Sequence, residues 1–190
     1  MQEADDLLLI NQYLKGDEKS LELIIKKYLK SIYGFIFQFV RNSHDTEDLT
    51  QEVFVKMWRW RKKIKKEKNF KSWLFTIAKN TAIDFLRKRK ELTFSDIDSD
   101  NDDRPFIETI NDDLMLPDEI FEQVNLEKII SAALEKLPLQ YRLVITLHYQ
   151  NEFTFSEISN ILNKPLNTVK SHWQRGLLRL KKILLENPLN

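Results

Sequence analysis

The chain has no cysteine among its 190 residues, and it has only three glycines and five prolines. Without cysteine it can form no disulfide, no thiolate metal site and no cysteine nucleophile. So few glycines and prolines leave little material for strands and tight turns, and the composition therefore favours an all-α fold. The three histidines, His44, His148 and His172, are far apart in sequence and lack the spacing of metal ligands, which converge on one point. We expect neither a metal nor a cofactor.

Long apolar runs are also missing from the sequence, and we expect no secretory signal. No apolar stretch approaches the roughly 20 residues that a helix needs to span a bilayer. The N-terminus opens with the acidic residues Glu3, Asp5 and Asp6, where a secretory signal would carry positive charge followed by an apolar segment. We expect a soluble, cytoplasmic protein without a membrane span.

The charges of the chain are segregated in blocks. The formal net charge is +1, yet residues 1–55 carry −4, residues 56–90 carry +12, residues 91–125 carry −11 and residues 126–190 carry +4. The acidic block contains 12 acidic residues and one arginine, without sustained periodicity. Because structureless segments of this length are uncommon inside a compact domain, we interpret the acidic block as a flexible linker. It would join two small helical domains, 1–90 and 126–190.

The N-terminal domain is predicted to begin with a short helix and a long helix. Apolar residues between residues 4 and 40 follow the helical period, which is interrupted at Lys15-Gly16-Asp17. We interpret the aromatic residues of the long helix as core. Ser43 or Asp45 is expected to cap a third helix, which carries one stripe of acidic, amide and apolar side chains. That stripe can contact another protein and consists of Asp48, Gln51, Glu52 and Val55.

The block from residue 56 to residue 90 has the charge of a nucleic-acid surface. It contains 14 lysines and arginines against two acidic residues, whereas a merely solvated helix mixes both signs. A basic loop over residues 61–69 precedes a helix from Phe70 to Lys90, on which polar residues recur at helical spacing. We expect this polar stripe to face phosphates and bases, and it consists of Ser72, Thr76, Lys79, Asn80 and Arg87.

The helical period returns in the C-terminal domain from Leu126 and stops at Pro138. A second helix is expected from Gln140 to Gln150. A helix-turn-helix pattern follows this second helix.

The helix-turn-helix is bounded by local signals. Thr154 and Glu157 form a capping box that opens a short helix. The break at Asn163-Lys164-Pro165 separates it from a longer basic helix, which Asn167 or Thr168 is expected to cap.

The last helix has an apolar face and an outward face that can read DNA. A recognition helix touches base edges with the residues near its N-terminal end. Gly176, inside this helix, costs about 1 kcal/mol relative to alanine. The outward residues are Lys170, Ser171, Gln174 and Arg175.

The two halves resemble regions 2 and 4 of the bacterial sigma factors of the sigma-70 family. Region 2 is suggested by DTEDLTQEVFVKMW and FKSWLFTIAKNTAIDFLRKRK, and region 4.2 by Leu137-Pro138 and the TVKS run from Thr168 to Ser171. The short, two-domain organisation is similar to that of the extracytoplasmic-function (ECF) group. The resemblance implies an alternative sigma factor that is not an enzyme. Its partners would be RNA polymerase core (beta-prime subunit and beta flap), a two-part promoter that it helps to melt, and an anti-sigma factor.

The resemblance also assigns DNA-binding roles to individual residues. The basic loop and the next helix would grip the non-template strand of the minus-ten element, with one base flipped into a pocket. Asn80 matches a family contact position, and its amide carries both a donor and an acceptor. The minus-ten set is Arg61, Lys62, Lys63, Lys71, Ser72, Trp73, Thr76, Lys79, Asn80 and Arg87. The minus-thirty-five set is Thr168, Lys170, Ser171, His172, Gln174, Arg175 and Arg179, in which His172 stands where the family usually has arginine.

Two other classes of protein fit parts of the sequence. A stand-alone helix-turn-helix regulator would need a ligand pocket or a symmetric helix face in residues 1–60, where neither a glycine-rich phosphate loop nor a clean heptad is present. An enzyme could use Glu47, Asp48 and Glu52 as acid and base, but these residues have no partner motif. A sigma factor accounts for both halves in their order, and we adopt this hypothesis.

Overall fold

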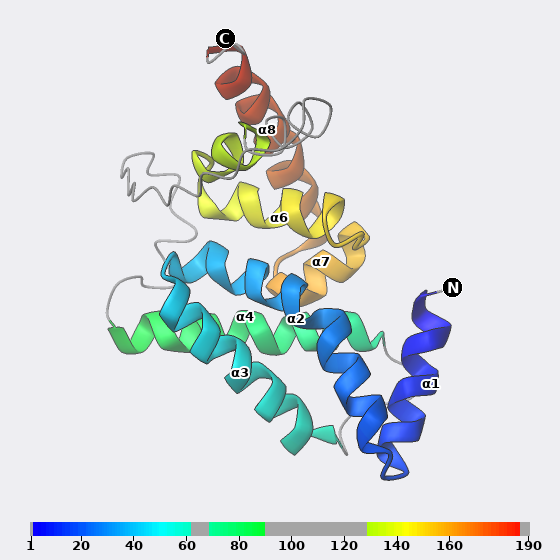
Figure 1. The fold of residues 1–190 in the computed structure, drawn as a ribbon. Coiled ribbons are helices and arrows are strands. Elements are labelled where there is room, and N and C mark those ends of the chain that lie inside the picture. Colours follow the sequence, from blue (N-terminus) through cyan, green and yellow to red (C-terminus); the bar gives the residue numbers. More distant parts are fainter. Residues whose placement is uncertain (1, 62–68, 90–128, 187–190) are drawn as a thin grey trace, which may run out of the picture.

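The structure is a computed structural model that describes residues 2–61, 69–89 and 129–186. Every regular element in these ranges is a helix, as predicted, and none of these helices is long and apolar enough to cross a membrane. Figure 1 shows α1 to α4 in one tier and α6 to α8 in a second tier above it. The helices are α1 (Gln2–Leu14), α2 (Glu18–Val40), α3 (Ser43–Arg59), α4 (Phe70–Arg89), α6 (Leu139–Tyr149), α7 (Phe155–Leu162) and α8 (Leu166–Glu186). A short helical segment also covers residues 129–135.

Helices α1 and α2 form a hairpin whose turn is set by Gly16 and Asp17. Gly16 has a φ of +101°, a left-handed conformation that glycine adopts without steric cost. The Asp17 carboxylate accepts a backbone N–H of the first turn of α2 as its N-cap. Across the hairpin, the buried Asp6 accepts hydrogen bonds from the Tyr28 hydroxyl and, at 2.6 Å, from Lys27 Nζ. The turn predicted at this point is confirmed.

The N-cap of α3 differs from the prediction, because neither Ser43 nor Asp45 occupies it. Asn42 is the N-cap: its backbone is extended, with a φ of −135°, and its side-chain oxygen accepts the Asp45 N–H at 2.9 Å. Arg41, with a φ of +57°, ends α2 immediately before it. The cap therefore falls on the first extended residue after the left-handed turn.

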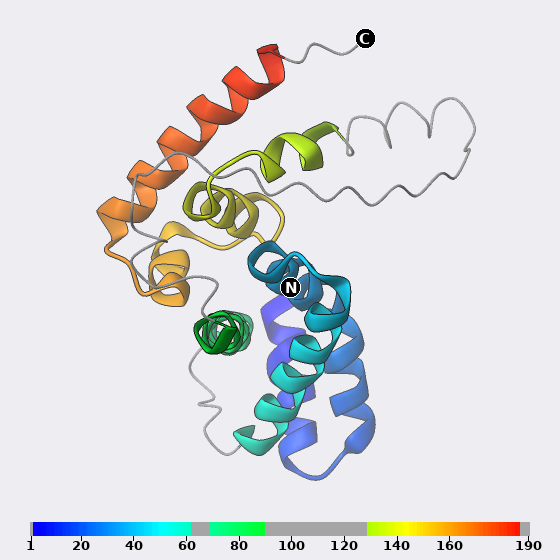
Figure 2. The same ribbon diagram turned by 90° about the vertical axis from the view of Figure 1, so that its left-hand side faces the viewer.

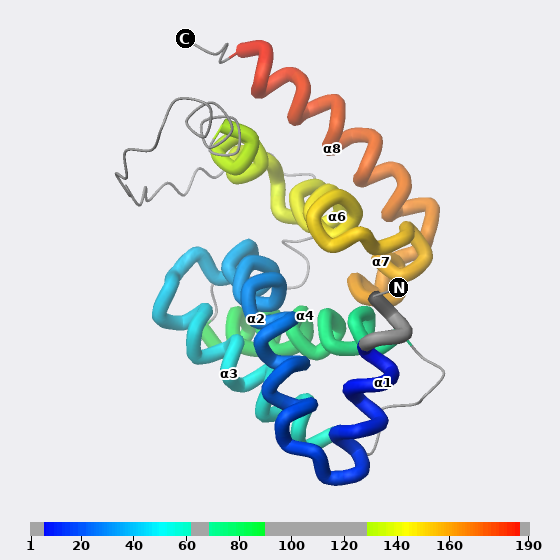
Figure 3. The backbone as a smooth tube through the Cα atoms, turned by 45° about the vertical axis from the view of Figure 1, so that its right-hand side comes forward, coloured from blue at the N-terminus to red at the C-terminus, as the bar shows by residue number. Residues whose placement is uncertain are grey.

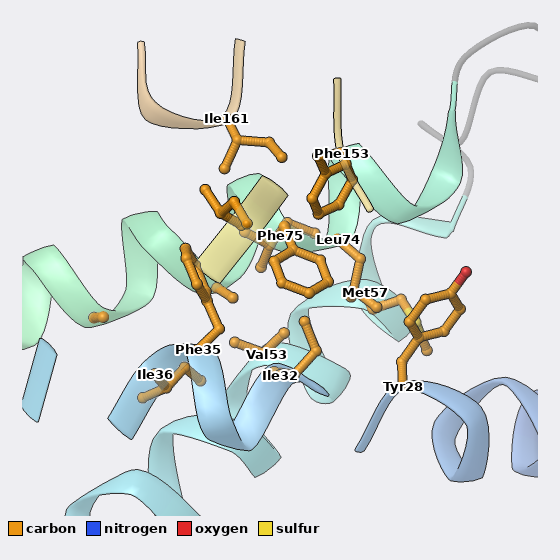
Figure 4. Packing of buried hydrophobic residues seen from close by; sticks show 14 of the residues in the cluster. Tyr28, Ile32, Phe35, Ile36, Val53, Met57, Leu74, Phe75, Phe153 and Ile161 are labelled. Carbon is orange, nitrogen blue, oxygen red and sulfur yellow. The ribbon is translucent and has the colours of Figure 1, made fainter. Parts of the chain in front are cut away.

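The core of the N-terminal half lies where α2, α3 and α4 cross. Figure 4 shows Phe35 and Ile36 of α2, Val53 and Met57 of α3, and Phe75 of α4 packed together, each no more than 1% exposed. The Phe35 and Phe75 rings have centroids 5.1 Å apart. This apolar contact fixes the crossing of α2 over α4.

The aromatic residues of α2 divide between its two sides. Tyr28, Phe35 and Phe39 are buried, as predicted. Tyr33 and Phe37 are only half-buried and stack on each other with centroids 6.3 Å apart. The prediction that all of the aromatic residues are core is therefore wrong for these two, because the helical period turns them away from α3 and α4.

Helix α4 is packed on several sides, because the C-terminal half also covers it. Helices α2, α3 and α7 all contact it, and Figure 2, which views α4 nearly end-on, shows α3 and α7 on different sides. The Phe153 ring, just before α7, packs edge-on against Phe75 with centroids 5.0 Å apart. Ile158 and Ile161 of α7, both 0% exposed, belong to the same apolar cluster. One continuous core therefore joins the two halves.

The predicted helix-turn-helix is formed by α7 and α8. Thr154 and Glu157 make the predicted capping box: the Glu157 N–H donates to Thr154 Oγ1 at 3.3 Å, and the Thr154 N–H donates to Glu157 Oε2 at 2.8 Å. Asn163 ends α7 in the left-handed conformation, with a φ of +54°. The local signals around α7 thus act as the sequence indicates.

The start of α8 differs from the prediction. The helix begins at Leu166, so neither Asn167 nor Thr168 is its N-cap. The Pro165 carbonyl accepts the Val169 N–H at 3.1 Å and opens the helix. Proline suits this position because the N–H that it lacks would have no partner within the helix.

Helix α8 crosses α6 closely at Gly176, and Figure 3 shows it extending past α6. A Cβ atom at Gly176 would lie 2.9 Å from Ile145 Cδ1 and 3.1 Å from Tyr141 Cβ. The Ile145 methyl group can move aside, but Tyr141 Cβ is fixed to the backbone of α6. The glycine that the sequence marks as costly therefore permits the close crossing that orients α8.

We expect Gly176→Ala to lower the free energy of unfolding by about 1–3 kcal/mol, because overpacking outweighs the gain in helix propensity. Gly34 is the matched control, since it lies exposed within α2 with no heavy atom within 4 Å of an added Cβ. Gly34→Ala should raise the free energy of unfolding by about 0.5–1 kcal/mol. Urea unfolding of both variants measures the two effects, and stabilisation by Gly176→Ala would contradict the close crossing.

Candidate nucleic-acid interface

The outer face of α3 carries the predicted protein-binding stripe. Asp48, Gln51, Glu52 and Val55 are all exposed, while residues on the opposite side of the helix are buried. Glu52 pairs with Lys56 Nζ at 2.8 Å, within the same helix. Val55 is 46% exposed and adds apolar area to this polar surface. The stripe is one continuous surface.

Polar contacts with α4 hold this surface in place. Lys56 Nζ donates a hydrogen bond to Thr81 Oγ1 at 2.9 Å. At the other end of α3, Arg89 Nη1 lies 2.8 Å from Asp45 Oδ2. Helices α3 and α4 therefore have a fixed relative orientation.

The polar residues predicted along α4 do not share one exposed face. Asn80 and Arg87 are exposed, and Arg87 lies 3.6 Å from Asp84. Ser72 and Thr76 are half-buried, and the Thr76 hydroxyl donates to the Ser72 carbonyl oxygen at 2.9 Å. The expectation that the whole stripe faces outward is wrong in this structure, because the C-terminal half packs on the start and middle of α4.

Lys71 is turned toward the C-terminal half. Its Nζ donates to the Asn151 carbonyl oxygen at 2.6 Å and lies 4.9 Å from the centroid of the Phe153 ring. The ammonium group is thereby satisfied by contacts within the protein.

Lys79 is buried at 7% exposure and lines a small cavity between α4 and the C-terminal half, with Lys164 and His172 among the other lining residues. It makes no hydrogen bond or ion pair with the described residues. Burial lowers the pKa of Lys79, and the positive charge of Lys164 adds to this effect, whereas Asp84 opposes it. A lysine predicted to bind phosphate is thus buried at a place where its positive charge is disfavoured.

The remaining residues of the minus-ten set lie near the start of α4 and the end of α3. The Arg61 guanidinium stacks over the Trp58 ring at 4.9 Å and donates to the Trp58 carbonyl oxygen at 3.1 Å. Trp73 is half-buried and packs against Phe70 with centroids 5.8 Å apart. Two further members of the set, Lys62 and Lys63, lie outside the described residues, as does the predicted linker 91–125.

The first turns of α8 present three of the predicted minus-thirty-five residues to solvent: Lys170, Gln174 and Arg175 are exposed. They lie on the side of α8 opposite the buried Val169. Thr168 is half-buried, and its carbonyl oxygen accepts a hydrogen bond from the Ser171 hydroxyl at 2.9 Å. An exposed group of basic and amide side chains at the start of the second helix is the arrangement that reads base edges.

Two members of the minus-thirty-five set pack against α6. The His172 ring lies edge-on to the Tyr141 ring with centroids 5.5 Å apart, and the Arg179 guanidinium lies 5.0 Å from the same ring. Both side chains are half-buried. Both side chains therefore help to orient α8 against α6, in addition to their predicted contact with DNA.

Arg142 holds the two halves together, and the sequence analysis missed it. Its guanidinium donates to the Gln38 carbonyl oxygen at 2.9 Å and to the Glu135 carbonyl oxygen at 3.1 Å. Both carbonyls lie in the last turns of helical segments, where backbone oxygens lack partners and a positive charge is favoured. Burial, with a smaller effect of the Arg41 charge, lowers the pKa of Arg142 to about 9, and Glu135 opposes the shift.

A second polar contact missed from the sequence joins Asn69 and Glu157. Asn69 Nδ2 donates to Glu157 Oε1 at 2.5 Å, while Asn69 Oδ1 accepts the Ser72 N–H at 3.1 Å and caps α4. The two partners are 88 residues apart in sequence, and Arg142 and Gln38 are 104 apart. No local pattern could have revealed either pair. Within the described part of the chain, no cluster of three or more acidic or histidine side chains could hold a metal ion.

Comparisons with known proteins agree with this arrangement. Residues 24–91 match the family model of Sigma-70 region 2, and residues 127–180 match that of Sigma-70, region 4. The chain is 33% identical over 176 residues to the ECF RNA polymerase sigma factor SigW of Bacillus subtilis. The aligned region covers 92% of this chain and 94% of that protein. It is 27% identical over 171 residues to the ECF RNA polymerase sigma-E factor of Escherichia coli K12, covering 90% and 89% of the two chains.

Solved structures share the fold. CnrH, solved in complex with the cytosolic domain of CnrY, has a TM-score of 0.66 at 18% identity, over 97% of this chain and 99% of that chain. The sigma factor RpoE of Bartonella quintana, solved with the anti-sigma factor NepR, has a TM-score of 0.65 at 23% identity, over 87% and 97% of the two chains.

The helical fold, the exposed stripe on α3 and the helix-turn-helix of α7 and α8, together with the two family matches, define a transcription initiation factor of the sigma class. The chain belongs to the ECF group of the sigma-70 family. It is an alternative sigma factor rather than a stand-alone regulator, and the sequence hypothesis is confirmed in this respect. Sigma factors are initiation factors rather than enzymes, and they act with RNA polymerase core on promoter DNA.

Because the buried Lys79 has a pKa below its ordinary 10.5, the folded state binds fewer protons than the unfolded state, and stability rises with pH between the two pKa values. We therefore expect Lys79→Met to raise the free energy of unfolding by about 1 kcal/mol at neutral pH, by removing a buried unpaired charge. The advantage should shrink as the pH rises through the lowered pKa of Lys79, because the wild-type amine then loses its proton. Urea unfolding across this range measures it, with the exposed Lys88→Met, on the same helix, as the control. An advantage that is absent at neutral pH would contradict the unfavourable burial.

Proposed function

We propose that α3 contacts the beta-prime subunit of RNA polymerase core through Asp48, Gln51, Glu52 and Val55. The observation that supports the proposal is that these side chains are exposed together at positions within the match to Sigma-70 region 2. An acidic and amide surface complements a basic partner, and Val55 supplies apolar area. The C-terminal half would contact the beta flap, as the resemblance implies.

The two DNA elements are assigned to different halves of the chain. Residues 1–90 would form the domain for core polymerase and the minus-ten element, and residues 126–190 the domain for the minus-thirty-five element, joined by 91–125. Exposed Asn80 supports the first assignment, since an amide can pair with a base edge. The exposed outward face at the start of α8 supports the second assignment.

An anti-sigma protein is a further proposed partner. The support is the fold shared with two proteins solved in complexes, one of which is a sigma factor with its anti-sigma factor. We place the protein in the cytoplasm because RNA polymerase core and the chromosome are there, and we assign it no catalytic activity and no cofactor.

Reversing the charge of the α3 stripe tests the polymerase contact. Asp48→Arg combined with Glu52→Arg should reduce the affinity for core polymerase at least tenfold, since like charges across an interface cost about 1.4 kcal/mol or more. The matched control is Glu18→Arg combined with Glu22→Arg, which makes the same charge change on the exposed start of α2. Co-elution and fluorescence titration with core polymerase measure the effect. Equal binding by both double variants would contradict the assignment of the stripe.

Single substitutions along α8 separate base reading from phosphate contact. Gln174→Ala or Arg175→Ala should cost about 1–3 kcal/mol on the preferred minus-thirty-five element and flatten the preference among its single-base variants. Lys181→Ala or Lys182→Ala, further along the helix, should weaken all sequences about equally and make the salt dependence shallower. DNA titrations at two salt concentrations distinguish these outcomes. A loss that is equal for every sequence with Gln174→Ala and Arg175→Ala would show that this face does not read bases.

A further inference from the structure

Three basic side chains line the small cavity between α4 and the C-terminal half. Lys79 comes from α4, Lys164 from the turn between α7 and α8, and His172 from α8. None of the described residues that line the cavity is acidic, and the others are Gln140, Phe39, Ile83, Leu143 and Leu162. Apolar walls with a few convergent polar groups are typical of a small-ligand site, and basic groups without an acidic neighbour favour an anionic ligand.

Lys79 is the member of this set whose charge lacks a partner. It is 7% exposed and makes no hydrogen bond or ion pair with the described residues. Burial lowers its pKa, and the charge of Lys164 lowers it further. Asp84 opposes this shift, but its side chain is exposed on α4 and lies 3.6 Å from Arg87. Because a buried ammonium group is costly without a counter-charge, a bound anion would stabilise it.

The cavity limits the size of such an anion. Its volume is about 30 Å³, whereas one water molecule needs roughly 10–15 Å³. The cavity therefore has room for a ligand of a few heavy atoms, such as phosphate or sulfate, and not for a nucleotide. These oxyanions carry several acceptor oxygens, which suit the ammonium groups of Lys79 and Lys164 and a ring N–H of His172.

We propose that this cavity binds one small inorganic oxyanion of the size of phosphate or sulfate, held by Lys79, Lys164 and His172. The site goes beyond the proposed function and does not depend on a role of α4 in binding the minus-ten element. A DNA strand carries phosphates of the same chemistry. Because the C-terminal half packs over Lys79, a free ion fits the cavity as it stands, whereas a polynucleotide does not.

Urea unfolding of the complete protein tests the site, with inorganic phosphate as the probe. The ionic strength is held constant with gluconate, an anion too bulky for the cavity. At about ten times its dissociation constant, phosphate should lower the unfolding equilibrium constant of the wild type about tenfold, with a saturable dependence on concentration. Phosphate also stabilises proteins by exclusion from their surfaces, so this non-saturable effect has to be subtracted with variants.

Lys79→Met should lose the saturable response, and the exposed Lys88→Met, on the same helix, should keep it. Since Lys79→Met is expected to be more stable than the wild type without phosphate, misfolding would not explain its lost response. Equal responses of the wild type and Lys79→Met would overturn the proposal.

The histidine ring signals locate the bound ion in a proton NMR titration. The chain has three histidines, of which His172 lines the cavity, while His44 lies exposed on α3 and His148 stacks on Phe155. The His172 signal, assigned by its absence from His172→Gln, should shift with the same saturation curve as the stability, and the His44 signal should not. A saturable stabilisation that leaves the His172 signal unmoved would place the ion elsewhere and contradict the proposed site.

A single-stranded oligonucleotide distinguishes a free ion from a phosphate of DNA. Added at the same concentration of phosphate groups, it should not reproduce the stabilisation that depends on Lys79. If the oligonucleotide produces this stabilisation and inorganic phosphate does not, Lys79 binds a phosphate of DNA and the site for a free ion is wrong.

Discussion

Helix α4 is surrounded by α2, α3 and α7, and this packing determines the arrangement of the whole protein. Phe75 is the central residue, because its ring meets Phe35 of α2 on one side and Phe153 of the C-terminal half on the other. Buried aromatic pairs of this kind contribute both apolar area and a preferred geometry. The same contact that closes the core of the N-terminal half therefore also fixes the position of the helix-turn-helix relative to it.

Two cations, Arg142 and Lys79, are buried between the N-terminal and C-terminal halves, and they differ in how well their charges are compensated. Arg142 lies where two helical segments end, and its planar guanidinium donates to carbonyl oxygens of both, so its charge is matched by the negative ends of the helices. Lys79 has no such partner among the described residues and has Lys164 close to it. Arg142 stabilises the packing of the two halves on each other, whereas the buried charge of Lys79 destabilises it.

The orientation of α8 depends on shape more than on charge. Gly176 lets α8 approach α6 closely, while Tyr141 of α6 receives both His172 and Arg179 of α8 on its ring. The exposed residues at the start of α8 are consequently held at a defined angle to the rest of the C-terminal half. Family membership explains why a helix-turn-helix is present, but the angle at which it is presented follows from these local contacts.

The sequence by itself determined the helices, the turn at Gly16, the capping box of α7, the exposed stripe on α3 and the sigma-factor family, because periodicity, capping and family motifs are local properties of the chain. It misplaced the caps of α3 and α8 by a few residues, since several polar residues there could each have served. Only the tertiary structure decided that Lys71 and Lys79 face the C-terminal half and that Arg142 and Glu157 join the two halves. These contacts connect residues that are far apart in sequence, so a pattern confined to a few helical turns contains no record of them.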